Sequence, residues 1–268
     1  MTPVANARMY SATPAAKQAW KVLLGWALAR AGLEWEVLDY DVPAPLAALW
    51  ARDDLGCVLM CGLPFTQRAP RPALVASPVP AGERYAGRPV YFTDFAVRAD
   101  APYGTLEDTF GGVVGFTLAD SYSGCVALRA HLLPHRQARG APLYRSAVGG
   151  FVNARKIIEA LDKGRIDVGP LDSYYFDLLR ANDPDCAAKV RLVGSTDAAP
   201  IPAFIATAAL AAPDLERLRN ALLEAGTVPE LGAQRSLLQL ARFAVPREQD
   251  YTTIGSALAR SRSFPDPW

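Results

Sequence analysis

Apolar and amphipathic runs alternate along the first sixty residues. An apolar run that has a proline at its start and a glycine after its end predicts a helix over Pro14–Ala31. Short β-prone runs predict strands at 7–10, 35–39 and 57–61, and apolar residues at helical spacing predict a short helix at 45–52. Because consecutive strands joined by helices pair in parallel, this order predicts a parallel sheet with crossover helices.

A similar alternation continues along the rest of the chain. Further strands are predicted at 74–78, 89–97, 113–118, 146–148, 166–170, 190–195 and 203–208. Helical segments are predicted at 106–110, 125–133, 153–161, 173–181, 213–224 and 231–242, with a Pro- and Arg-rich loop at 64–72 and an irregular tail.

This order of elements predicts an α/β protein with two Rossmann-like lobes. We assign residues 1–93 and 203–268 to lobe 1 and residues 94–202 to lobe 2. The β-rich segment 91–98 and the Pro-rich segment 196–202 would cross between the lobes and form a two-segment hinge. In such folds ligands bind between the lobes, at the carboxyl ends of the strands.

The composition excludes several classes of protein. Of 268 residues, 51% are hydrophobic and 21% are charged, which is ordinary for a globular chain. The net charge is only +1 and no basic block interleaves with aromatics, so we expect no nucleic-acid partner. No uncharged apolar run approaches about 18 residues, so we expect no membrane insertion. Because residues 1–10 lack a signal-peptide pattern, we expect a periplasmic protein if a signal was removed and a cytoplasmic one otherwise.

The four cysteines do not suggest a disulfide or a metal centre. In a strand, the Cα atoms of Cys57 and Cys61 would lie about 13 Å apart, too far for a disulfide. The remaining cysteines are Cys125 and Cys186, and the chain has only two histidines. We therefore expect buried thiols, no metal site and no cofactor.

A turn between a strand and a helix carries the strongest candidate chemistry. The apolar run from Val113 ends in Asp120-Ser121-Tyr122-Ser123-Gly124, and a helix-like run follows at once. The first N–H groups of a helix have no intrahelical partner and carry partial positive charge, so they bind anions readily. The hydroxyls of Ser121 and Ser123 add donors, and Gly124 allows close approach to the backbone. Alternatively, one of these serines simply caps the helix.

Several short motifs occur in an order that resembles one family. They are Arg8-Met9-Tyr10, Met60-Cys61-Gly62-Leu63-Pro64, the segment 91–98, Ser121-Tyr122-Ser123-Gly124, Gly149-Gly150, the segment 161–168, Pro170-Leu171-Asp172 and the segment 199–204. Together they resemble the phosphate, phosphite and phosphonate substrate-binding proteins of ABC transporters, which have the type 2 periplasmic-binding-protein fold.

The resemblance implies a two-lobed solute receptor that closes on a small oxyanion and delivers it to an ABC transporter permease. It implies that Ser121, Tyr122, Ser123 and Gly124 hold the oxygens, that Tyr10 lines the cleft and that Asp172 faces an amine or hydroxyl of the ligand. We expect a monomer. Where the family often has Gly-Ser-His, this chain has Gly149-Gly150-Phe151, which lacks a donor and adds a ring. A sulfonate, a carboxylate or a larger organic anion with an aromatic part therefore stays open beside phosphonate.

Other candidate ligand residues have simpler alternatives. Thr93, on the hinge strand, and Phe151 are predicted to line the ligand site. Tyr10 is alternatively a half-buried surface residue, and Asp172 is alternatively a helix cap. Arg98 suits an anion, but pairing with Asp94 or Asp100 at the surface is the simpler interpretation.

The sequence gives little indication of an enzyme. A serine nucleophile needs a base, and His131 and His135 lie two to three turns beyond the start of the helix that follows Ser123. No hydrolase, zinc-protease, phosphate-loop or dinucleotide motif is present. We therefore predict no catalytic residues. The alternatives are a lyase or cofactor-biosynthesis enzyme of the same fold, using Asp172 or Tyr10 as acid or base, and a cytoplasmic small-molecule sensor.

Overall fold

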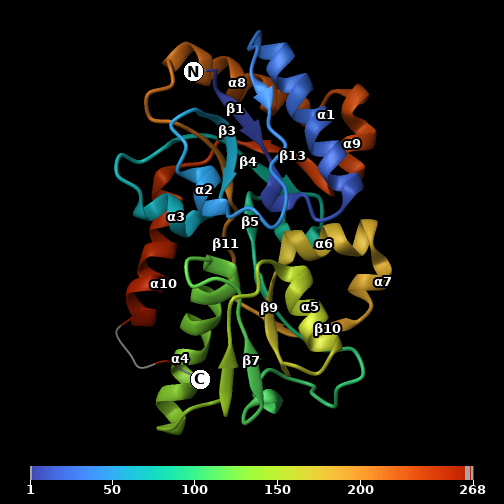
Figure 1. Ribbon diagram of the computed structural model, residues 1–268, viewed down its shortest axis with the longest axis vertical. Coiled ribbons are helices and arrows are strands. Elements are labelled where there is room, and N and C mark those ends of the chain that lie inside the picture. Colours follow the sequence, from blue (N-terminus) through green and yellow to red (C-terminus); the bar gives the residue numbers. More distant parts are fainter. Residues whose placement is uncertain (1, 263–265, 267) are drawn as a thin grey trace. The chain divides into compact units, whose positions relative to one another are not determined.

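The computed structural model describes residues 2–262, 266 and 268 (Figure 1). Contacts divide the chain into two units. Unit 1 comprises Met1–Val90 and Pro200–Tyr251, and unit 2 comprises Tyr91–Ala199 and Thr252–Trp268. The strands β5 (Val90–Tyr91) and β11 (Ala199–Pro200) contain two of the points at which the chain passes from one unit to the other.

These boundaries differ from the expected lobes of 1–93 with 203–268 and 94–202, because the C-terminal segment joins unit 2. The expected irregular tail contains the helix α10 (Thr252–Arg262). This helix packs against α4 (Ala127–Arg139) (Figure 1) and buries Ile254 and Ala257. Its threonines, serines and glycine are weak helix formers, so packing rather than propensity explains a helix that the sequence did not predict.

Unit 1 is built on a six-stranded sheet in the order β13-β4-β12-β3-β1-β2. The strands are β1 (Val4–Asn6), β2 (Glu36–Val37), β3 (Leu55–Met60), β4 (Ala73–Pro80), β12 (Ala203–Ala206) and β13 (Leu240–Ala244). Strand β1 pairs in parallel with β2 and β3, as predicted, whereas β12 is antiparallel to β3 and β4, and β13 is antiparallel to β4. The parallel pairing predicted for the first three strands is therefore confirmed, and the antiparallel pairs formed by β4, β12 and β13 make the whole sheet mixed.

Three predicted segments of unit 1 differ from the structure. Instead of a strand at 7–10, a 3₁₀ turn, η1 (Arg8–Tyr10), follows β1, because Asn6 Oδ1 accepts the Arg8 N–H at 2.9 Å and bends the chain. The predicted loop at 64–72 begins with the helix α3 (Gly62–Gln67). The predicted helix at 231–242 is the short α9 (Gly232–Leu237) followed by β13, with Gln239 at φ +45° between them.

The helices of unit 1 are α1 (Pro14–Ala31), α2 (Leu46–Trp50), α3, α8 (Ala212–Ala225) and α9, with the short turns η1, η2 (Glu83–Tyr85), η5 (Pro229–Leu231) and η6 (Glu248–Tyr251). Each of these helices except α9 buries apolar residues. Helix α1 has the bounds that the sequence predicts: Thr13 Oγ1 accepts the Ala16 N–H at 3.1 Å, and Gly32 ends the helix at φ +65°. Its Trp20 ring lies edge-on to Phe204 of β12, with ring centroids 5.8 Å apart.

An ion pair before β3, between an exposed guanidinium and a buried carboxylate, gives a stability test. Arg52 donates to both carboxylate oxygens of Asp54 at 2.7 and 2.6 Å, and the Asp54 side chain is only 5% exposed. We expect Arg52→Gln to lower the free energy of unfolding by about 2 kcal/mol at pH 7, because the carboxylate loses its charged partner. Hydrogen bonding to Arg52 holds the pKa of Asp54 below its usual range. The stability from this lowered pKa is therefore present above about pH 4 and is lost as the pH falls through the folded-state pKa.

Chemical denaturation of both proteins at pH 7 and pH 3 tests this expectation. The difference in free energy of unfolding between Arg52→Gln and the parent should be smaller at pH 3 than at pH 7. An equal difference at both pH values would contradict it.

Unit 2 contains a three-stranded antiparallel sheet and a two-stranded parallel one. The first has the order β10-β6-β9, formed by β10 (Val190–Ser195), β6 (Thr93–Arg98) and β9 (Gly169–Asp172), and the second pairs β7 (Val113–Gly115) with β8 (Ser146–Val148). The Gly115 N–H donates to the Val168 carbonyl at 2.7 Å and joins β7 to the segment that enters β9. This strand begins three residues later than the predicted 166–170 and therefore ends on Asp172.

The helices of unit 2 cover a core around Phe95, Val114, Leu128 and Val168. They are η4 (Tyr122–Val126), α4, α5 (Ala154–Asp162), α6 (Ser173–Asn182), α7 (Pro184–Ala187) and α10, with the turn η3 (Glu107–Thr109). All four cysteines are buried thiols, as predicted. Of the helices in the described residues, none is both long and apolar enough to cross a membrane.

Candidate functional site

The turn before α4 has the predicted form of a loop that leads into a helix. Strand β7 ends at Gly115, and a π-helical turn, η4, continues directly into α4. Ser121 Oγ accepts the Gly124 N–H at 3.1 Å, so the capping interpretation is confirmed for Ser121. The Thr117 N–H donates to the Gly124 carbonyl at 2.8 Å and folds the preceding loop back onto the helix start. The serine cap keeps its own hydroxyl hydrogen, so it can still donate to a ligand.

Gly124 is required by close packing behind the turn. A Cβ atom at this position would lie 1.7 Å from Thr117 Oγ1 and 2.8 Å from Ser121 Oγ. The Thr117 side chain is buried, and its hydroxyl has no hydrogen-bond partner among the described residues. The absence of a side chain at Gly124 therefore fixes how closely the loop approaches the first helical turn.

Ser123 provides the donor that the helix cap does not use. Its side chain is buried, yet its hydroxyl makes no hydrogen bond within the part of the chain that the structure describes. It lies in the first helical turn, where backbone N–H groups lack intrahelical partners and the helix dipole is positive. A hydroxyl without a partner beside such N–H groups suits an oxyanion.

Thr93 and Asp172 lie together beside this turn. They are directly opposite each other in the antiparallel pair of β6 and β9, so their side chains share one face of the sheet. Strand β9 packs against η4. Asp172 Oδ1 accepts the Tyr175 N–H at 3.0 Å, which confirms that it caps α6. The backbone of Thr93 exchanges hydrogen bonds with Thr196 at 2.9 and 3.1 Å, which fixes the strand in place.

The loop that carries Phe151 contacts the loop before the turn. The Gly150 N–H donates to the Thr117 carbonyl at 3.0 Å, and Gly150 has a φ of +85°, which favours glycine. A Cβ atom on Gly149 would lie 2.3 Å from the Phe116 ring. Phe151 is half-buried, and Asn153 caps α5 by accepting the Lys156 N–H at 3.1 Å. Phe151 is therefore held on a loop joined to the candidate turn.

The other predicted residues are placed as follows. Tyr10 ends η1 in unit 1 and is 1% exposed, so the half-buried surface alternative was wrong. Tyr122, on η4, has its ring centroid 6.4 Å from that of Tyr91. Arg98 forms an ion pair with Asp100, as the simpler interpretation predicted. Unit 2 thus brings together Thr93, Ser121, Tyr122, Ser123, Gly124 and Asp172, with Phe151 on the adjoining loop.

Both histidines line a groove of about 700 Å³ between α4 and α10. Its lining includes Tyr122, Asp197 and Arg260 but neither Ser121 nor Ser123. Burial lowers the pKa of His131, and the neighbouring His135 lowers it further. Among the described residues, no three His, Cys, Asp or Glu side chains are arranged to hold a metal ion.

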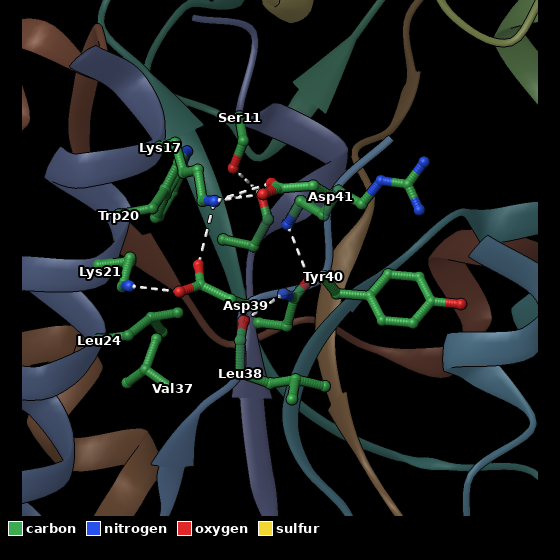
Figure 2. Close-up of a pocket in the computed structure, with 13 residues that line it drawn as sticks. Ser11, Lys17, Trp20, Lys21, Leu24, Val37, Leu38, Asp39, Tyr40 and Asp41 are labelled. Atoms are coloured by element: carbon green, nitrogen blue, oxygen red, sulfur yellow. Dashed lines mark hydrogen bonds and ion pairs between the residues drawn. The ribbon is translucent and has the colours of Figure 1, made fainter. Parts of the chain in front are cut away.

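A second, much smaller pocket lies in unit 1 beside α1. Figure 2 shows Lys17 between Asp39 and Asp41, with Lys21 also directed at Asp39. The Lys17 Nζ lies 2.7 Å from Asp41 Oδ1 and 3.0 Å from Asp39 Oδ1, and hydrogen bonds from Lys21 and Lys17 lower the pKa of Asp39. The space is only about 20 Å³, room for about one water molecule. Because the charges pair with one another, we do not consider this pocket a ligand site.

Two apolar residues next to the turn did not stand out in the sequence. Leu118 and Val152 are exposed, whereas the sequence placed Leu118 at the end of the predicted strand 113–118 and Val152 between the predicted strand at 146–148 and the helix at 153–161. Thr117 likewise gave no signal, since its role depends on contact with a glycine seven residues later.

Comparisons with solved structures give the fold. A binding-protein component of a phosphonate ABC transporter from Pseudomonas aeruginosa has a TM-score of 0.79 at 15% identity, over 98% of this chain and 87% of that chain. PhnD1 from Prochlorococcus marinus, solved with methylphosphonate, has a TM-score of 0.77 at 14% identity, over 98% and 99%. XAC2383 from Xanthomonas citri, solved with ATP, has a TM-score of 0.67 at 19% identity, over 98% of each chain. These similarities confirm the expected type 2 periplasmic-binding-protein fold.

A comparison at the level of sequence families identifies the family. A search of curated proteins found no match. The sequence model of the family described as ABC transporter, phosphonate, periplasmic substrate-binding protein matches residues 17–251, which is most of the chain. The chain therefore belongs to the periplasmic substrate-binding proteins of phosphonate ABC transporters, a family that captures solutes for transport.

Proposed function

We propose that the start of α4 holds the oxyanion of the transported solute. The observation that carries this proposal is Ser123, a residue only 7% exposed in the first turn of a helix, whose hydroxyl has no hydrogen-bond partner among the described residues. It would donate to the oxyanion together with the Ser121 hydroxyl and the N–H groups of the first turn. The remaining proposed ligand residues are Tyr10, Thr93, Tyr122, Gly124, Phe151 and Asp172.

The proposed ligand is a small oxyanion such as a phosphonate, phosphate or related anion. PhnD1, which shares the fold, was solved with methylphosphonate. Phe151 stands where the family often has a histidine, so we propose that this chain holds its ligand with fewer donors and more apolar contact. Asp172 would face an amine or hydroxyl on the ligand through the carboxylate that also caps α6.

We further propose that the protein binds its ligand without chemical turnover. Catalysis by Ser121 or Ser123 would need a base, and both histidines line the groove between α4 and α10, whose lining contains neither serine. The family role in transport supports the same view. The proposed setting is the periplasm, as a monomer that delivers its ligand to an ABC transporter permease.

A thermal-shift screen tests the proposal. The panel contains phosphate, phosphite, phosphonates, sulfonates and small carboxylates. A ligand at a hundred times its dissociation constant adds about 2.7 kcal/mol of stability, which raises the melting temperature by roughly 5–10 °C for a domain of this size.

We expect at least one class of oxyanion to give such a shift. Ser123→Ala should weaken its binding about tenfold, because one charge-assisted hydrogen bond is lost. The absence of any shift across the panel, or unchanged affinity in Ser123→Ala, would reject the site.

A further inference from the structure

Residues that follow α10 contact the segment of chain that contains the oxyanion turn. The Trp268 ring stacks on the Phe116 ring, with centroids 5.2 Å apart and an angle of 5° between the ring planes. The Arg129 guanidinium lies over the same Trp268 ring, 5.6 Å from its centroid. Arg129 Nη2 also lies 2.5 Å from Asp266 Oδ1 and donates to the Ser261 carbonyl at 3.1 Å. Arg129 therefore binds this part of the chain through a ring, a carboxylate and a carbonyl.

The two residues that touch the Trp268 ring lie on opposite sides of the turn in the sequence. Phe116 is the first residue after β7, five residues before Ser121, and Arg129 lies on α4, six residues after Ser123. Stacked aromatic rings attract each other at this separation, and a guanidinium within about 6 Å of a ring centroid is attracted to the ring. Trp268 therefore links the loop that enters the turn to the helix that leaves it.

Phe116 also connects the turn to the loop that carries Phe151. A Cβ atom on Gly149 would lie 2.3 Å from the Phe116 ring, and the Phe116 N–H donates to the Val148 carbonyl at 3.0 Å. The next residue, Thr117, donates its N–H to the Gly124 carbonyl at 2.8 Å. Phe116 is half-buried, so the partner that stacks on its ring helps to fix where the ring lies. A displaced Phe116 would disturb both loops of the proposed site.

We propose that Trp268 is a positioning residue for oxyanion binding. Stacked on Phe116 and covered by Arg129, it keeps the loop in the form that presents the Ser121 and Ser123 hydroxyls to the ligand. The inference rests on the proposed oxyanion site and adds a residue that acts through Phe116. Without the Trp268 ring, the loop would also populate forms in which the hydroxyls and backbone N–H groups do not converge. Apparent affinity falls in proportion to the fraction of molecules in the binding form.

Two measurements on the full chain and on Trp268→Ala test the proposal. Titration calorimetry uses methylphosphonate, inorganic phosphate, methanesulfonate and acetate as probes. If the binding form falls to between a tenth and a fifth of the molecules, the probes that bind the parent will bind the variant about five- to tenfold more weakly. Hydrogen exchange without ligand should show faster exchange of the amides in residues 116–124, with unchanged exchange in α5.

Two further substitutions distinguish stacking from the filling of space. Trp268→Phe keeps an aromatic ring that can stack on Phe116, so its affinity should stay within about twofold of the parent. Trp268→Leu keeps an apolar side chain but has no ring, so it should bind as weakly as Trp268→Ala. Parent-like affinity in Trp268→Leu would show that stacking does not position the turn.

A matched control separates positioning from a general loss of stability. Phe110 and Trp268 are both partly buried and pack against the same core of unit 2. Phe110 precedes β7, at the end of the strand away from the turn, and its ring lies edge-on to Tyr144 with centroids 5.5 Å apart. Phe110→Ala should lower the melting temperature at least as much as Trp268→Ala does, but should leave oxyanion affinity unchanged.

The outcomes separate the two proposals. If an oxyanion binds the parent and Trp268→Ala equally well, or if exchange in residues 116–124 does not change, the inference is wrong and the oxyanion site stands. Equal losses of affinity in Phe110→Ala and Trp268→Ala would also overturn the inference. If none of the four probes binds the parent, the proposed site itself is wrong, and the inference falls with it.

Discussion

Replacing Ser123 with aspartate is expected to remove measurable oxyanion binding. The new carboxylate would lie where the Ser123 hydroxyl is proposed to donate. Two like charges about 4 Å apart repel by about 4 kcal/mol at an effective dielectric constant of about 20, which corresponds to a loss of about a thousandfold in affinity. The variant should nevertheless fold, because a carboxylate in the first turn of a helix interacts favourably with the helix dipole.

The matched control is Ser123→Asn, which has nearly the same shape as aspartate but no charge. We expect this variant to retain weakened binding, so the difference between the two variants isolates the charge. Melting temperatures with and without a ligand found in the oxyanion screen provide the measurement. Equal ligand-induced shifts in Ser123→Asp and the parent would show that the anion binds elsewhere.

A methyl group at Gly124 is expected to damage both stability and binding. The Cβ atom of Gly124→Ala would lie 1.7 Å from Thr117 Oγ1, a distance that no rotation of the new methyl relieves. Overpacking of this kind costs about 1–3 kcal/mol of folding free energy, and relief of the clash would push the loop away from the helix start. We therefore expect a lower melting temperature together with at least tenfold weaker oxyanion binding.

Two further variants make this expectation specific. Gly255→Ala, inside α10, meets no atom within 4 Å and should be neutral or should stabilise by up to about 1 kcal/mol. Combining Gly124→Ala with Thr117→Gly removes the contacting side chain and should recover part of the lost binding. If Gly124→Ala binds oxyanions as the parent does, close packing behind the turn has no part in recognition.

The sequence predicted elements best where local signals and burial agree. Helix α1 begins after the cap Thr13 and ends at Gly32, so both bounds could be read from the chain. Strand β13 could not, because its five residues follow a short helix without a proline or glycine between them, and the change is made at Gln239. The antiparallel pairing of β12 could not be predicted from local sequence either, because β12 comes from a distant part of the chain and lies between β3 and β4 in the sheet of unit 1.

The candidate site was predictable to the extent that its chemistry is local. A serine-rich turn between a strand and a helix is visible in the sequence, and both Ser121 and Asp172 have the capping geometry expected of such residues. Contacts between separate segments were not visible. The pairing of Thr93 with Asp172 depends on the register of two strands. The exposure of Leu118 and Val152 depends on tertiary packing, since no other described segment covers them.

Because α10 is part of unit 2, this unit cannot be completed until the end of the chain has been synthesised. Neither unit is a continuous stretch of chain: unit 1 needs the strands near residues 203 and 240, and unit 2 needs a helix that follows them. During synthesis, the face of α4 that α10 covers is therefore exposed until about 110 further residues have been translated. Completion of the second unit depends on the last part of the chain to be translated, so loss of that part would affect the unit that carries the proposed oxyanion turn.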